Sequence, residues 1–113
     1  MIGRTITVTL ALCVALAGCA HGSRSGNAAN ELDRLANGFI ATLTEQERAT
    51  LKKAEETDLP MFHFGAGSRV RQLYFGPDGE GRKAFCTPGA YCDIDRESMR
   101  IVERAWQIIR GAG

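Results

Sequence analysis

The feature that most limits what this 113-residue chain can fold into is an apolar run close to its start. The run covers residues 6–17 and follows a single positive charge at Arg4. As a helix its twelve residues would reach about 18 Å, at 1.5 Å per residue. A bilayer core is about 30 Å thick and needs about 20 residues. The run is therefore too short to span a membrane, and its layout is that of an export signal.

The residues that follow the apolar run are Leu16, Ala17, Gly18 and Cys19. They resemble the lipobox of bacterial lipoproteins, in which a leucine and two small residues precede a cysteine. In that family the cysteine thiol receives a diacylglycerol, the signal is cut just before it, and the new amine is usually acylated. The resemblance implies that residues 1–18 are a lipoprotein signal peptide and that Cys19 carries acyl chains such as palmitate. The alternative is a chance cysteine behind an ordinary signal peptide.

A lipidated Cys19 would attach the protein to a membrane, because two or three acyl chains anchor firmly where a single chain holds only marginally. Residue 20 is Ala and not Asp. In enterobacteria-like hosts this resembles the rule that sends lipoproteins on to the outer membrane. We therefore expect an outer-membrane lipoprotein that faces the periplasm, with the inner membrane as the alternative.

The cysteine count agrees with this interpretation. Of the four cysteines, Cys13 lies in the signal and Cys19 would carry lipid, which leaves Cys86 and Cys92. An oxidising compartment favours a disulfide between such a pair. The ring of seven residues would contribute about 2.4 kcal/mol through the chain-entropy term. Without lipid at Cys19, three cysteines would remain, an odd number.

The exported part is short and electrically balanced. Cleavage before Cys19 leaves 95 residues (113 − 18), enough for one small domain. Loss of Arg4 leaves 13 basic residues (14 − 1) against 13 acidic ones. This balance argues against a nucleic-acid partner, which requires a concentrated basic face. It also predicts no polybasic membrane patch, so the lipid alone would hold the chain.

The sequence after the cysteine divides into a tether and a domain. Residues 20–30 are rich in Gly, Ser and Asn and show no hydrophobic period, so residues 19–30 are interpreted as the lipidated cysteine and a flexible tether. Residues 31–113 are predicted to form one small helical domain.

Two helices are predicted before Pro60, which prevents easy continuation. The first begins at Glu31 behind the capping residue Asn30, and the second covers about residues 45–56 behind a capping box at Thr44. One long helix with a bend at Thr44 is the alternative. The apolar residues of the first helix recur at helical spacing. They are Leu32, Leu35, Phe39 and Leu43.

The second half of the domain also reads as helical. Ser68 is predicted to cap a short helix, and Asp95 to cap a well-buried final helix that stops at Gly111. The only strand candidates are residues 61–64 and 84–85. The predicted fold class is mainly α, a small bundle of three to four helices with one short disulfide-closed loop. The inward side of the final helix is predicted to hold Ser98, Ile101, Val102, Ala105, Trp106, Ile108 and Ile109.

Two blocks of this second half resemble a family of small, mostly bacterial proteins with a domain of unknown function. The family pattern is approximately Gly-x-x-Ile-Arg-Asn, then Asp-Asp-Met-Ser-x-Ile-Ile and a closing Trp-x-x-Leu-x-Gly. Gln72, Arg96 and Glu97 depart from it, and the resemblance covers about the last fifty residues. It implies a compact helical unit and no activity. The matching residues are Gly67, Ser68, Arg69, Val70 and Arg71, then Asp95, Ser98, Ile101, Trp106, Ile109 and Gly111.

One candidate site is a possible anion-binding cluster of Gly67, Ser68, Arg69 and Arg71. Glycines let backbone N–H groups converge, a helix start favours negative charge, and arginines add donors. The alternative is a glycine turn with a capped helix and a structural salt bridge. In either case we expect Arg71 to reach Asp95 at the start of the final helix, where an arginine–carboxylate pair can be bidentate.

His63 is the other candidate, as a general base or ligand. Its neighbours in the sequence are two phenylalanines, so the alternative is a partly buried, hydrogen-bonded imidazole. Zinc requires about four ligands, and only His63, Cys86 and Cys92 are plausible, so no metal and no cofactor are expected. The spacing Cys86-x₅-Cys92 also lacks the redox pattern Cys-x-x-Cys. The aromatic residues expected in the core are Phe39, Phe62, Phe64 and Trp106.

Together these features predict a small lipid-anchored cell-envelope protein with a non-enzymatic binding or structural role in the periplasm, whose partner is an envelope protein or the cell wall. The alternative is a cell-wall enzyme or enzyme inhibitor that uses an anion-binding site around His63, Arg69 and Arg71. Convergence of these three side chains on one pocket would favour the enzyme or inhibitor. Dispersal among packed aromatic residues would favour the interaction module.

Overall fold

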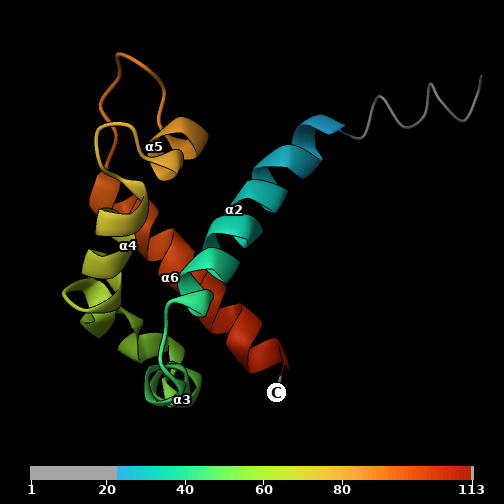
Figure 1. Cartoon of the computed structure of the whole chain (residues 1–113), viewed down its shortest axis with the longest axis vertical. Helices are drawn as coiled ribbons and strands as arrows, with labels where there is room; N and C mark the ends of the chain where they lie inside the picture. Colours follow the sequence, from blue (N-terminus) through green and yellow to red (C-terminus); the bar gives the residue numbers. More distant parts are fainter. Residues whose placement is uncertain (1–22, 113) are drawn as a thin grey trace, which may run out of the picture. The chain divides into compact units, whose positions relative to one another are not determined.

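The computed structural model describes residues 23–112, and the statements below concern this part of the chain. The predicted signal peptide, residues 1–18, and the predicted lipidation site, Cys19, lie outside the described residues. The fold is mainly α, a small helical bundle with a disulfide-closed loop, as predicted (Figure 1). Within the described part there are five α-helices and one 3₁₀ helix, more elements than the three to four expected.

The first described helix, α2, covers Ser23–Ala41 and begins earlier than predicted. The predicted cap Asn30 lies inside it, and residues 23–30 are helical where a flexible coil was expected. The two alanines that precede Asn30 favour helix, and a lone cap signal cannot stop a helix that already runs through it. The chain divides into two units after Asn30, and the second unit, residues 31–113, is described below.

Helix α3, Glu45–Lys53, is separate from α2 because the predicted capping box forms. The Glu47 amide donates to Thr44 Oγ1 at 3.1 Å, and the Thr44 amide donates back to Glu47 Oε1 at 2.9 Å. The alternative of one long helix is therefore wrong. Acidic residues in the first turn and two lysines in the last turn suit the helix dipole.

A 3₁₀ helix, η2, covers Glu56–His63 and includes Pro60. Residues 61–64 are therefore not a strand. Helix α4, Ala66–Tyr74, follows almost at once. It begins behind Gly65, so Ser68 lies within the helix and does not cap it.

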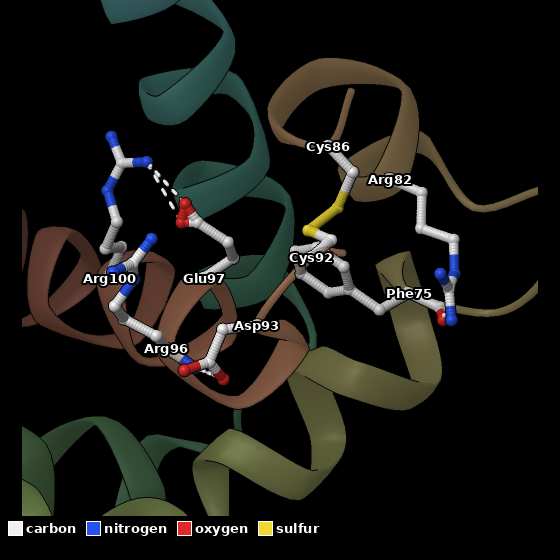
Figure 2. Close-up of a disulfide and its surroundings, with 8 residues drawn as sticks. All are labelled: Phe75, Arg82, Cys86, Cys92, Asp93, Arg96, Glu97 and Arg100. Atoms are coloured by element: carbon white, nitrogen blue, oxygen red, sulfur yellow. Dashed lines mark hydrogen bonds and ion pairs between the residues drawn. A yellow bond between two sulfur atoms is a disulfide. The ribbon is translucent and has the colours of Figure 1, made fainter. Parts of the chain in front are cut away.

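Helix α5, Glu80–Phe85, leads into the disulfide-closed loop, so residues 84–85 do not form a strand either. Cys86 and Cys92 are bonded, with their Cα atoms 5.4 Å apart (Figure 2). Between them the Ala90 amide donates to the Thr87 carbonyl at 3.1 Å, and Gly89 takes a φ of 80°. A positive φ at this position of a β-turn favours glycine.

The final helix, α6, covers Ile94–Ala112. Its cap is Asp93, whose Oδ1 accepts from the Arg96 amide at 3.2 Å (Figure 2). The predicted cap Asp95 lies one residue inside the helix. A cap carboxylate accepts a hydrogen bond from the backbone amide two or three residues ahead. Asp93 immediately precedes α6, so its carboxylate reaches the amide of Arg96 three residues ahead.

The core lies around α6, which packs against α3, η2, α4 and α5 (Figure 1). Ser98, Ile101, Val102 and Ala105 are fully buried, as the spacing predicted, and Trp106 is partly buried. No helix of residues 23–112 combines the length and the apolar character needed to cross a membrane. The buried apolar residues are Leu35, Ala36, Phe39, Leu43, Leu51, Ala54, Leu59, Val70, Tyr74, Phe75, Ile101, Val102 and Ala105, all of them within the second unit.

Candidate functional site

The four residues of the predicted anion-binding cluster all lie on α4, and both of its arginines form ion pairs within the domain. Gly67 and Ser68 are the second and third residues of α4 and lie in its first turn, not in the loop before it. Gly67 is buried, and a Cβ there would lie 3.0 Å from Met99 Sδ of α6. The glycine therefore serves the close approach of α4 to α6, which is a packing role.

Arg69 is fully engaged by an acidic side chain of α3. Its Nη2 donates to Glu47 Oε2 at 2.6 Å and its Nη1 donates to Oε1 at 3.1 Å. Hydrogen bonds from Arg69, and then from the Thr44 amide, lower the pKa of Glu47 from 4.5 to about 2. The same carboxylate thus caps α3 and ties it to α4, so an incoming anion would have to displace Glu47 from Arg69.

Arg71 lies within reach of Asp95, as predicted, with Nη1 3.4 Å from Oδ1. The contact is a single long one and not the bidentate pair that was considered. Its Nη2 donates to the His63 carbonyl at 3.4 Å, while Nη1 is buried and has no hydrogen-bond partner among the described residues. Arg71 therefore links η2, α4 and α6 and does not present itself to a ligand.

His63 contacts Arg71 through its backbone carbonyl, but its ring does not share a hollow with Arg69. Its partly buried ring packs edge-on against Phe64, with ring centroids 4.9 Å apart. It lines a hollow with Met99 and the carboxylate side chains Glu56 and Glu103, whereas Arg69 lines a different hollow. Of the three residues expected to converge for an enzyme or inhibitor, His63 and Arg71 are therefore in contact, whereas Arg69 lines a separate hollow.

A hollow between α3, η2 and α4, which we call the α3–α4 hollow, is the better candidate for a binding site. It has a volume of about 370 Å³, within the range of ligand pockets. Its base is apolar, and the Arg69–Glu47 ion pair stands at its side. The lining residues are Phe39, Leu43, Thr44, Gln46, Glu47, Thr50, Leu51, Phe62, Gly65, Ala66 and Arg69.

Two large apolar side chains, Met61 and Phe64, stand exposed next in sequence to Phe62 and Gly65, which line this hollow. Met61 is 80% exposed and Phe64 is 85% exposed, although Phe64 was expected in the core. A 3₁₀ helix has three residues per turn, so residues three apart share a side. Leu59 and Phe62 therefore point inward together, and Met61 and Phe64 point outward together. The spacing of Leu59, Met61, Phe62 and Phe64 carried this signal, since residues three apart share a side in a 3₁₀ helix and in an α-helix alike.

The disulfide-closed loop presents another exposed aromatic side chain, Tyr91, which is 91% exposed. The bridge lies beside Phe75 (Figure 2).

Within residues 23–112 no group of three or more His, Cys, Asp or Glu side chains is placed to hold a metal ion. Comparisons of the chain with protein family models, curated proteins and solved structures find no match.

Proposed function

We propose that this chain is a lipid-anchored protein of the cell envelope whose helical domain acts by binding and not by catalysis. The anchor is supported by the sequence Leu16–Cys19 and by the even cysteine count that lipidation would leave. We further propose an outer-membrane location, with the domain in the periplasm, and kinship of the second half of the domain with the small bacterial family that it resembles.

The observations that support binding are the α3–α4 hollow and the exposed side chains of Met61 and Phe64, which belong to the segment that supplies Phe62 and Gly65 to this hollow. Large apolar side chains that stand together on a surface are a feature of interaction sites. The one ion pair of the hollow is internally neutralised, since Glu47 occupies Arg69. The group that enters is therefore an uncharged, apolar one, such as a side chain of an envelope protein.

A non-enzymatic role is supported by the dispersal of the polar candidates. A general base must lie within hydrogen-bond reach of the proton that it abstracts, and a nucleophile needs such a base beside it. In the described part of the chain, the hollow lined by His63 includes neither Arg69 nor Arg71, and both arginines are engaged in ion pairs.

The anchor is tested by Cys19→Ala, with Cys13→Ala as the matched control inside the predicted signal. The wild-type protein and Cys13→Ala should partition into the detergent phase and carry an acylated N-terminal cysteine by mass spectrometry. Cys19→Ala should lose both properties. Detergent-phase partition that survives Cys19→Ala would contradict the proposed anchor.

The binding role is tested by a photo-crosslinking residue placed at Phe64 in intact cells, with the same residue at Tyr91 as control. The two side chains are almost equally exposed but belong to different parts of the domain. A discrete cross-linked partner should form from Phe64 and not from Tyr91. Identical adducts from both positions, or none from Phe64, would refute a binding site at the α3–α4 hollow.

A further inference from the structure

A second hollow, which we call the basic hollow, lies between α2, α3 and α6. It has a volume of about 360 Å³. Its apolar part consists of three isoleucines that the core leaves partly exposed, one from α2 and two from α6. The lining residues are Asn37, Ile40, Arg48, Ala49, Lys52, Ile108 and Ile109, which include two cations and no acid.

The two cations, Arg48 and Lys52, are exposed and one helical turn apart on α3. Neither forms an ion pair with a carboxylate of the described residues, not even with Glu45 on the preceding turn. Most arginines elsewhere in this part of the chain are paired. They are Arg34, Arg69, Arg71, Arg100, Arg104 and Arg110. The basic hollow therefore combines uncompensated positive charge with an apolar base.

That combination matches a ligand with a negative head and apolar chains. We propose that the basic hollow is a docking surface for anionic phospholipids of the membrane, and that it orients the domain on the bilayer. This role rests on the proposed lipid anchor. The sequence did not predict this docking surface, because the net charge of the chain is balanced and the acidic residues that balance Arg48 and Lys52 lie elsewhere on the surface.

Two cations bind a membrane weakly by themselves. Each Lys or Arg close to an anionic surface strengthens binding about 5-fold, so Arg48 and Lys52 together contribute about 30-fold. Covalent attachment at Cys19 would keep the domain close to the bilayer, which makes docking an intramolecular event. A weak surface on a lipid-anchored domain is thus enough to bias its orientation, while the acyl chains supply the attachment.

The geometry of α3 gives this orientation a consequence. Successive helical residues are rotated by about 100°, so the side of α3 centred on Arg48, Ala49 and Lys52 lies roughly opposite the side centred on Gln46, Glu47, Thr50 and Leu51. The first set lines the basic hollow and the second lines the α3–α4 hollow. A domain docked through the basic hollow therefore keeps the α3–α4 hollow turned away from the bilayer and open to a partner.

The test is sedimentation of residues 20–113 with lipid vesicles. This piece lacks Cys19 and contains the whole described core, so vesicle binding is measured apart from the anchor. Vesicles of phosphatidylcholine with roughly a quarter of phosphatidylglycerol are compared with pure phosphatidylcholine, in about 50 mM and about 500 mM NaCl. The variant is Arg48→Gln with Lys52→Gln. The matched control is Lys83→Gln with Arg96→Gln, which changes the net charge equally at exposed positions away from the basic hollow.

We expect binding to the anionic vesicles at low salt, a loss of about 30-fold in the Arg48/Lys52 variant, and a control close to wild type. No binding, equal losses in both variants, or equal binding to pure phosphatidylcholine would overturn the proposal. So would binding of monomeric decanoate without binding of vesicles, which would indicate a site for a free amphiphile. An unmodified Cys19 would refute the anchor alone, whereas a lipidated Cys19 without vesicle binding would refute this inference alone.

Discussion

Gly38 and Tyr74 offer a stability test in which one substitution changes sign with its background. Gly38 belongs to α2, and a Cβ at this position would collide with the hydroxyl of Tyr74 from α4. Tyr74 is buried, and its hydroxyl donates to the Leu35 carbonyl at 3.0 Å. The ring cannot move away from a new methyl group without losing this hydrogen bond.

The magnitude follows from three opposing contributions. Replacing Gly by Ala inside a helix stabilises by about 1 kcal/mol. Overpacking costs about 1–3 kcal/mol, and the lost hydrogen bond costs about 0.5–1.5 kcal/mol. Gly38→Ala should therefore lower the free energy of unfolding by about 1–3 kcal/mol, against the usual preference for alanine.

The Tyr74→Phe background removes the obstacle. The next atom of Tyr74, Cζ, would lie 3.7 Å from the new Cβ, an ordinary contact. Gly38→Ala should then stabilise by up to about 1 kcal/mol, the helix-propensity gain alone. A double-mutant cycle should give a coupling of about 2–3 kcal/mol between the two positions.

The assay is urea denaturation of the four proteins in the cycle, followed by circular dichroism, with unchanged m-values as the check on two-state behaviour. If Gly38→Ala stabilised the wild type, the contact with the Tyr74 hydroxyl would not exist. If it destabilised both backgrounds equally, the cost would have another origin. Either result would refute the reasoning.

Two further predictions concern the disulfide and the Arg69–Glu47 pair. Replacing Cys86 and Cys92 together by serine should lower the free energy of unfolding by about 2.4 kcal/mol, measured in the same denaturation assay, and reducing agent should then have no further effect. The lowered pKa of Glu47, about 2 against 4.5, means that its contribution to stability is present above pH 4.5 and is lost as the pH falls toward 2. The stability difference between wild type and Glu47→Gln should shrink over that range, and a difference that persists at pH 2 would contradict the assigned pKa.

The sequence predicted best where local signals reinforce one another. The capping box at Thr44 is reciprocal, since two hydrogen bonds form between the same two residues, and α3 begins where it was expected. The inward side of α6 followed from apolar residues repeated over several turns. The pairings Arg71–Asp95 and Cys86–Cys92 were also anticipated, each from a residue type with a narrow choice of partners.

Single-residue signals were less reliable. Asn30, Ser68 and Asp95 were each expected to cap a helix, and each lies inside one. A cap has a weak energy, typically about 1 kcal/mol, so helix-forming neighbours or packing against α6 shift the helix start past it. Phe64 was misplaced for a different reason, because it was assigned to the core as an aromatic residue and residues 61–64 form part of a helical turn in which Phe64 shares the outer side with Met61.

What the sequence determined by itself is short-range: the helical class, the capping box, the buried side of the last helix and the pattern that predicts export and lipidation. Each of these depends on residues a few positions apart. Only the tertiary structure decided that Arg69 is occupied by Glu47, that His63 stands apart from it, and that Arg48 and Lys52 meet three isoleucines from other helices. These features depend on which sides of distant helices meet, and that is settled by packing around α6 and not by any local preference.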